Sequence, residues 1–204
     1  MTHSNHAILF RLLAQALTYP ETTFAAQLQQ TISTIDLNTL DNPQCALPGF
    51  ITAVGNLKHI PLEHIQAEHT RLFINAYPHL PCPPYESAYR EGVLLGNAAE
   101  AVNRIYREHG IVVTGEEVDH AAVELEFMAF LLTLADDDAI ATARSFLESH
   151  LLKWMPDFAA DIRRASKLDF FRETGILLGA FLENMRTEFS RTTAPAAQID
   201  FSVH

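Results

Sequence analysis

The residues most able to bind a metal ion are the ten histidines of this 204-residue chain. Three of them are spaced five residues apart: His59, His64 and His69. On a helix, side chains at that spacing point well away from one another. A helical di-metal carboxylate site needs two Glu-x-x-His pairs, and the sequence has one, Glu117 to His120. His120 and Glu124, four residues apart, are more typical of a hydrogen bond than of half a ligand set. We therefore predict no metal site and no bound cofactor.

The sequence also lacks the motifs of common catalytic sites. Residues 110–117, GIVVTGEE, carry two glycines at the interval of a phosphate-binding loop, but glutamates follow where a lysine and a hydroxyl are required. Neither a Gly-x-Ser-x-Gly nucleophile turn nor a cysteine–histidine signature occurs. These observations predict that the protein is not an enzyme.

The two cysteines and the apolar runs indicate a compartment. Cys45 and Cys82 stand in different segments and form no disulfide framework, which favours a reducing environment. The N-terminal residues 1–15 lack the basic region, long apolar core and cleavage site of a secretory signal. The longest apolar runs, such as FMAFLLTLA at 127–135, are too short to span a bilayer. We expect a cytoplasmic protein that does not insert into a membrane.

Composition and charge narrow the classes of partner. The chain is 48% hydrophobic and 19% charged, which is typical of a folded globular protein with a sizeable core. Its net charge of −11 disfavours binding to nucleic acids and to anionic membranes, because a protein that binds either needs a basic surface. An acidic protein attracts cationic segments instead, although acidity can also serve solubility alone.

One short stretch has no counterpart elsewhere in the chain, PCPPYESAYREG at 81–92. Its prolines remove amide donors and favour extended backbone, so it could be a rigid connector that ends with Ser87 as a helix N-cap. It could also be a stiff wall that holds Tyr85 and Glu86 against a cleft. We predict that it serves both purposes.

Helical spacing of apolar residues recurs from end to end, and no window alternates with the period of a strand. Helices are expected at 5–18, 24–35, 50–57, 61–73, 98–109, 117–135, 138–152, 156–166 and 169–190. Residues 76–86 are the longest irregular connection, and 111–116 form a loop. The helix at 117–135 is apolar around its whole axis, so we expect it to be buried on all sides as the central element.

The fold class that follows is all-α, a single-domain helical bundle built around that central helix. Residues 1–190 are expected to form the domain. From 191 to 204, RTTAPAAQIDFSVH has the composition of a flexible C-terminal tail.

Four segments together resemble a known family. EHTRLF at 68–73, PCPPYESAY at 81–89, VDHAAVELEFMAFL at 118–131 and FLESHLLKWMPDF at 146–158 resemble the TorD/DmsD family of all-helical cytoplasmic chaperones for molybdenum enzymes. The four segments occur in the order of that family, and the resemblance covers residues 5–190.

The resemblance implies a system-specific chaperone. Such a protein binds the twin-arginine signal peptide of a molybdopterin oxidoreductase precursor, holds the precursor back from export and assists cofactor insertion and folding. The partners implied are that signal peptide and the body of the catalytic subunit, with the molybdenum-cofactor machinery as a further candidate. The resemblance does not specify the client enzyme, and it leaves both a monomer and a homodimer open.

The resemblance also implies a peptide-binding set. The family's Leu-Phe, Tyr-Glu-Ser and Asp-His motifs, with neighbouring residues, give His69, Leu72, Phe73, Tyr85, Glu86, Ser87, Tyr89, Asp119, His120 and Glu124. His69 departs from the family, because relatives often carry a large aromatic residue there. A twin-arginine peptide needs apolar pockets for its hydrophobic segment and acids for its arginines.

Structural interpretations of the same residues remain open. Leu72 and Phe73 complete an apolar helical stripe that is typical of core. Asp119 could be an ordinary acid near a helix N-terminus, beside Glu116 and Glu117. A buried polar network is also possible, formed by Asp119, His120 and Glu124 with Tyr85 or Tyr89. Both tyrosines belong to the proline-rich stretch.

Two other function classes also remain open. One is a nucleotide- or metal-dependent enzyme whose site is assembled from dispersed residues. The other is a structural subunit of a dehydrogenase complex.

Overall fold

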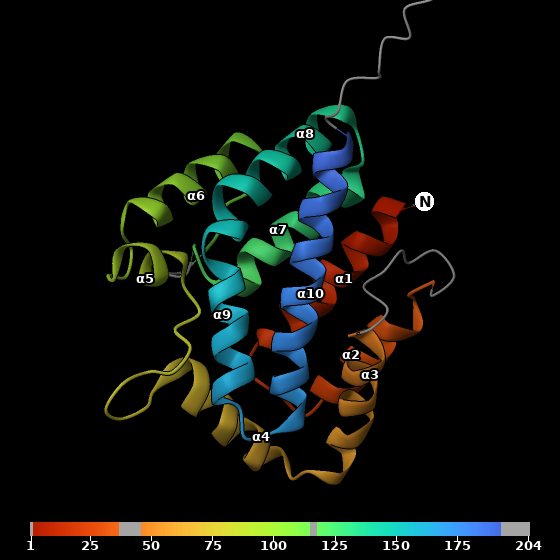
Figure 1. Cartoon of the computed structure of the whole chain (residues 1–204), viewed down its shortest axis with the longest axis vertical. Helices are drawn as coiled ribbons and strands as arrows, with labels where there is room; N and C mark the ends of the chain where they lie inside the picture. Colours follow the sequence, from red (N-terminus) through yellow and green to blue (C-terminus); the bar gives the residue numbers. More distant parts are fainter. Residues whose placement is uncertain (1, 37–45, 115–117, 193–204) are drawn as a thin grey trace, which may run out of the picture.

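The computed structural model describes residues 2–36, 46–114 and 118–192 (Figure 1). Regular elements in these ranges are all helices, which confirms the predicted all-α class. The first half contains α1 (Thr2–Leu17), α2 (Phe24–Ser33), α3 (Leu47–Asn56), η3 (Leu57–His59), α4 (Leu62–His69), η4 (Thr70–Ile74) and α5 (Glu86–Glu91). The second half contains α6 (Asn97–Glu108), α7 (Ala121–Leu134), α8 (Asp137–Phe146), η5 (Leu147–Leu151), α9 (Leu152–Ala165) and α10 (Asp169–Thr192).

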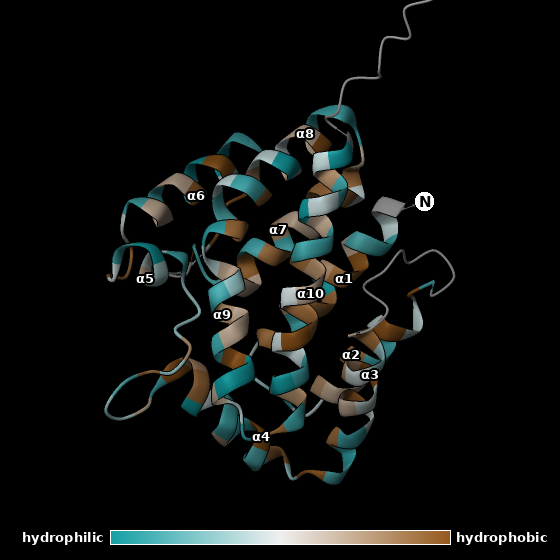
Figure 2. Ribbon diagram, viewed as in Figure 1, coloured by the Kyte–Doolittle hydropathy of each residue, from teal (hydrophilic) through white to brown (hydrophobic). Residues whose placement is uncertain are grey.

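Helix α7 is the central element, as its apolar sequence predicts. It packs mainly against α1 and α8, while α9 and α10 form a second closely packed pair. Figure 2 shows that the surrounding helices are amphipathic, because each carries both hydrophobic and hydrophilic residues. None of the helices in the described ranges combines the length and hydropathy of a membrane span.

The prediction that the central helix is buried on all sides was wrong along one stripe. Glu126 is exposed, Phe130 is 37% exposed and Leu134 is 50% exposed. These residues recur at intervals of four, so they share one face of α7, which the described helices leave partly exposed and where Glu126 pairs with Arg11 of α1 at 3.9 Å. The helix also begins at Ala121 rather than 117, because His120 is its N-cap. Cys45, Glu116 and Glu117 lie outside the described residues.

Two predicted helices contain a wider π turn. α4 continues into η4 at Thr70, and α8 continues through η5 into α9. The predicted break at 152–156 does not occur, because α9 starts at Leu152 and includes Pro156. Pro156 therefore lies inside a continuous helical segment, where it removes one backbone donor without ending the helix.

Helix α5 was not predicted, and it falls inside the proline-rich stretch. Its N-cap is Tyr85, in extended backbone, so the expected cap at Ser87 was wrong. Gly92 ends the helix in the left-handed conformation that glycine adopts most readily. At the other end of the chain, α10 runs to Thr192, two residues beyond the predicted boundary at 190. The remainder of the predicted tail, 193–204, lies outside the described residues.

Candidate functional site

A groove of about 840 Å³ opens between the end of α1, η4, the segment before α5, and the start of α7. Its lining is mainly apolar, with two histidines and two tyrosines as its main polar groups. The lining residues are Leu17, Thr18, Tyr19, His69, Phe73, Ile74, Leu80, Pro83, Pro84, Tyr85, Ala88, Gly92, Val93, Leu94, His120, Ala122 and Val123. None of these carries a carboxylate or a basic side chain other than imidazole.

The proline-rich stretch forms one wall of this groove, as predicted, but it holds Tyr85 against the groove and not Glu86. Pro84 accepts a hydrogen bond from the Ala121 amide at 2.8 Å, and the Glu86 amide donates to the Asp119 carbonyl at 3.1 Å. These two bonds pair Tyr85 with His120 in antiparallel fashion and tie the wall to the start of α7. The prolines therefore stiffen a segment that the neighbouring backbone fixes in place.

His69 and His120 are polar groups on this apolar surface. His69 Nε2 lies 3.1 Å from the Leu17 carbonyl, so Nε2–H donates and Nδ1 is left as a buried acceptor without a partner. His120 Nδ1 accepts from the Ala122 amide at 3.1 Å and so caps α7. Burial lowers the pKa of His69, and it lowers the pKa of His120 to about 4. Both imidazoles are therefore neutral at pH 7.

The aromatic residues around these histidines complete the groove. Phe73 packs edge-on against His69, with ring centroids 4.9 Å apart, and Tyr85 packs against His120 at 5.4 Å. Phe73 is 3% exposed and reaches both core and groove, whereas Leu72 is fully buried and does not line the groove. The core interpretation of Leu72 and Phe73 therefore agrees with their burial.

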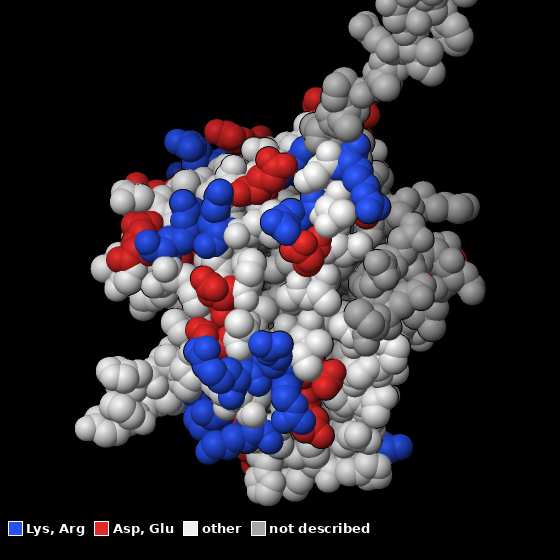
Figure 3. Space-filling view, viewed as in Figure 1, with Lys and Arg blue, Asp and Glu red and all other residues white. Residues whose placement is uncertain are grey.

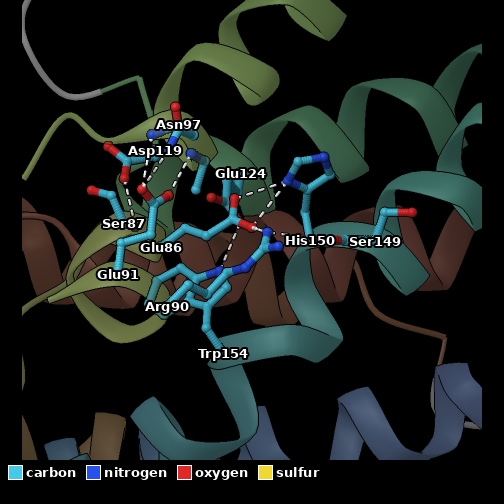
Figure 4. A network of polar contacts seen from close by, with 11 residues as sticks. Glu86, Ser87, Arg90, Glu91, Asn97, Asp119, Glu124, Ser149, His150 and Trp154 are labelled. Carbon is cyan, nitrogen blue, oxygen red and sulfur yellow. Dashed lines mark hydrogen bonds and ion pairs between the residues drawn. The ribbon is translucent and has the colours of Figure 1, made fainter. Parts of the chain in front are cut away.

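The predicted acids do not face the groove but form a buried cluster behind it (Figure 4). This carboxylate cluster consists of Glu86, Asp119 and Glu124, all with no exposed surface. Along α5, Glu86 and Arg90 are four residues apart and share a face, while Ala88 and Gly92 share the opposite face. The first face meets the cluster and the second lines the groove.

Glu86 is the centre of the carboxylate cluster. His150 Nδ1 lies 2.9 and 3.0 Å from its two oxygens, and Arg90 donates to the same carboxylate from one turn further along α5. Arg90 is the most exposed of the three, with 37% of its side chain exposed, against 7% for His150 and none for Glu86. Because His150 belongs to η5, this contact joins α5 to the π turn before α9.

Asp119 holds the start of α5. Its Oδ2 accepts a hydrogen bond from the Ser87 amide at 2.8 Å, which satisfies a first-turn donor of that helix. The acid thus caps α5 from outside it, whereas the sequence suggested a first-turn acid of the following helix. Asp119 Oδ1 and the Ser87 hydroxyl are buried without hydrogen-bond partners.

Glu124 is an acid that burial keeps neutral. Burial raises its pKa well above the usual range, and the neighbouring Glu86 carboxylate adds to the effect. Its Oε2 accepts from Trp154 Nε1 at 3.1 Å, while Oε1 has no donor within reach. A proton on Glu124 lets it donate to Glu86, which lies within hydrogen-bonding reach.

Only part of the predicted set is therefore brought together at one surface. His69, Phe73, Tyr85 and His120 line the groove. The other members are behind it: Leu72 in the core, Glu86, Ser87, Asp119 and Glu124 in or beside the cluster, and Tyr89 bonded to Asp161 at 2.9 Å. In the described part of the chain, His120 and Glu124 are joined through the backbone alone, the Glu124 amide donating to the His120 carbonyl at 3.1 Å, and no side-chain hydrogen bond joins Tyr89 to the cluster. As a peptide-binding set, these residues remain a prediction.

Sequence reasoning missed the residues that make the groove's rim. Val93 and Leu94 are more than half exposed and line it, as do Ile74 and Tyr19. The signal available in the sequence was GVLLG at 92–96, a run of apolar residues between glycines that fits no helical stripe. The cluster partners His150 and Trp154 were missed as well, because nothing local pairs them with Glu86 or Glu124.

On the one face of the described residues that Figure 3 draws, no acidic patch stands out that would replace the buried acids. On the face drawn in Figure 3, Lys and Arg gather over α4 and the lower part of α9, and acids are scattered. Arg71, in η4, is bound to Glu68 and to the Ala165 carbonyl. In the described ranges, no three His, Cys, Asp or Glu side chains meet in a way that could hold a metal ion.

Comparison with known families gives one match that spans most of the chain. The family described as the nitrate reductase delta subunit matches residues 21–160. This range contains every residue of the predicted peptide-binding set and both sides of α5.

Individual relatives carry related names. The chain is 30% identical over 125 residues to "Chaperone protein TorD" of Aeromonas salmonicida, which covers 57% of this chain and 58% of that protein. It is 29% identical over 157 residues to the protein of the same name from Photobacterium profundum, covering 71% and 72%. Matches to several curated relatives thus span about half of their length.

A solved structure supports the same fold. A crystal structure described as that of a candidate redox enzyme maturation protein from Archaeoglobus fulgidus superposes with a TM-score of 0.63 and 26% identity. The superposition covers 88% of this chain and 93% of the other. These matches confirm the resemblance drawn from the four sequence segments.

Proposed function

Because the chain belongs to the nitrate reductase delta subunit family, we propose that it is a cytoplasmic maturation chaperone for a molybdopterin oxidoreductase. In this proposal it binds the twin-arginine signal peptide of the enzyme's precursor, holds the precursor back from export, and assists cofactor insertion and folding. The observation that carries the proposal is the apolar groove, whose rim exposes large hydrophobic residues to solvent.

The groove suits the hydrophobic segment of such a peptide. Contiguous exposed apolar surface is uncommon on a monomeric protein and marks binding sites. The extended segment before α5 is already bonded to the start of α7 through Tyr85 and His120, and its prolines have no amide to donate. A bound peptide would therefore satisfy its own backbone, as a helix does, and place apolar side chains in the groove.

The arginines of the peptide are not assigned to the carboxylate cluster. Glu86 is already paired with Arg90 and His150, and Glu86, Asp119 and Glu124 have no exposed surface. An incoming arginine would have to displace α5 to reach them. We propose instead that the arginines act through long-range attraction. The net charge of −11 raises the rate at which the protein meets a cationic peptide.

The proposal is tested by titrating the protein with the leader peptides of all molybdoenzyme precursors encoded in the same genome. We expect saturable binding to at least one of them, with a negative heat-capacity change because apolar surface is buried. Ala88→Trp would fill the groove from α5 and should weaken that binding at least about tenfold. The control, Ala141→Trp, adds the same side chain on the exposed surface of α8 and should have no effect. Absence of saturable binding to any leader would refute the proposal.

The family description names a subunit, which favours one second candidate. A structural subunit would stay with the mature oxidoreductase, whereas a chaperone leaves once maturation is complete. Affinity purification from cells blocked in molybdenum-cofactor synthesis, and from normal cells, separates the two. A chaperone is recovered with the precursor in the first case and without the mature enzyme in the second.

A further inference from the structure

The segment between α5 and α6 exposes three consecutive apolar residues beside the groove. Val93, Leu94 and Leu95 are 53%, 62% and 55% exposed, and we call them the lip. Val93 and Leu94 line the groove, whereas Leu95 does not. The lip therefore continues the apolar surface of the groove beyond its edge.

The lip is held in a fixed conformation. Glu91, the last residue of α5, accepts hydrogen bonds from the Asn97 amide at 3.0 Å and from the Ala98 amide at 2.7 Å (Figure 4). These are the first two amides of α6, which otherwise lack helical partners. The Ala98 bond is the main cause that lowers the pKa of Glu91, so the acid is ionised at neutral pH.

The neighbouring backbone fits this arrangement. A Cβ at Gly96 would overlap Glu91 Oε2, so glycine is required for the acid to reach both amides. Leu95 has φ 57°, a left-handed conformation that is unfavourable for a residue with a side chain. With the backbone in this conformation, all three apolar side chains are more than half exposed.

We propose that the lip determines specificity, by selecting leader peptides whose apolar segment is long enough to extend from the groove across Leu95. This inference rests on the proposed function, since the occupant is the same peptide. Two observations identify that occupant: the lip is continuous with the groove, and it carries no charge of its own. It therefore suits the apolar part of the leader rather than the arginine-bearing part. In this arrangement Glu91 is a positioning residue that acts through the lip.

The first experiment tests the contact with Leu95. Leu95→Ser and the control Leu134→Ser, an equally exposed leucine on α7, are titrated with three peptides. These are the leader that binds best, and two variants in which the N-terminal or the C-terminal end of its apolar stretch is replaced by serines. Leu95→Ser should weaken binding of the parent leader about three- to tenfold, because part of a leucine side chain is no longer buried. With one of the two shortened leaders it should have no effect.

The outcomes separate the lip from the groove. If Ala88→Trp abolishes binding and Leu95→Ser changes nothing, the lip proposal is overturned and the proposed function stands. If Leu95→Ser weakens the binding of all three peptides equally, the lip does not select leaders by the length of their apolar segment. If Ala88→Trp also leaves binding intact, the leader binds outside the groove, so the groove and the lip both fail as its site while leader binding itself stands.

The second experiment tests the role of Glu91. Glu91→Ala should weaken leader binding about two- to fivefold at a temperature far below the melting transition, because the lip loses its fixed conformation. Glu91→Gln keeps an oxygen that can accept one of the two amide bonds and should restore much of the affinity. Equal affinity for the alanine variant and the parent protein would overturn the positioning role.

Discussion

The two faces of α5 adjoin opposite kinds of environment. Ala88 and Gly92 border an open apolar groove whose histidines are neutral, while Glu86 and Arg90 border a closed cluster of three carboxyl groups. The charged residues that resemble a binding motif are on the closed side, and the residues open to a ligand are mostly apolar. The comparison teaches that charged residues can form the support of a binding surface without being the surface itself. Variants of the cluster should therefore change stability, and variants of the groove should change affinity.

The largest expected effect is on stability, from Glu86→Ala. Removing this carboxylate leaves His150 buried without its partner and frees Arg90, and breaking such a buried pair costs about 3–5 kcal/mol. The control, Glu183→Ala, breaks the exposed pair with Arg186 and should cost less than about 1 kcal/mol. Denaturant unfolding of both variants measures the difference. Similar values for the two would contradict the structural role of the cluster.

The groove histidine His120 should make the free energy of unfolding depend on pH. The pKa of His120 is lowered to about 4 in the folded protein, from 6.5 in the unfolded chain. As the pH falls below about 6.5, the unfolded chain binds a proton that the folded protein does not, so stability is lost down to pH 4. The loss from this residue is at most about 3 kcal/mol.

The variant His120→Asn isolates that contribution, because its amide oxygen can still cap α7 and does not titrate. Its unfolding free energy should depend less on pH between about 6.5 and 4 than that of the parent protein. The same pH dependence in the variant and in the parent protein would show that His120 is not shielded from solvent.

Substitutions of Asp119 test whether this acid supports the start of α5 or contacts the leader peptide. Asp119→Ala removes the acceptor for the Ser87 amide and should lower stability by about 1–2 kcal/mol, as the loss of a helix cap does. Asp119→Asn keeps an acceptor oxygen and should recover part of that loss. Leader affinity, measured by calorimetry on fully folded protein, should be unchanged in both variants. A ten- to hundredfold loss of affinity at an unchanged melting temperature would instead indicate that Asp119 contacts an arginine of the leader directly.

The smallest expected effect comes from Glu124→Gln. The amide resembles the protonated acid, since it can accept from Trp154 and donate to Glu86, so stability at pH 7 should stay the same or rise by up to about 1 kcal/mol. In the parent protein the raised pKa of Glu124 contributes stability that is lost as the pH rises above about 4.5, the opposite sign to His120. Destabilisation by glutamine at pH 7 would mean that Glu124 is ionised.

Most helices could be predicted because their determinants are local. The apolar residues of α1, α6 and α10 recur at helical intervals, and the expected bounds lie within a few residues of those observed. Helix α5 could not be predicted in this way, because six residues after a run of prolines give too short a pattern. It persists because tertiary contacts hold both ends, through Asp119 at the start and Glu91 at the end.

The site residues show the same limit. The order of the motifs pointed to the region around 69–124, and four of the ten residues predicted there do line the groove. Sequence could not tell which polar residues face a ligand, because Glu86 and His150 are 64 positions apart and their pairing depends on how α5 meets η5.

The sequence by itself determined an all-helical protein, the central position of the helix after His120, and the stiffness of the proline-rich wall. Each of these follows from residue type and spacing along a single segment. The tertiary structure alone decided that α5 buries its acids and opens its small residues to the groove. That choice depends on the relative placement of α5, α7 and η5, because a carboxylate is stable in the interior only where distant segments bring it a proton, an amide or a cation.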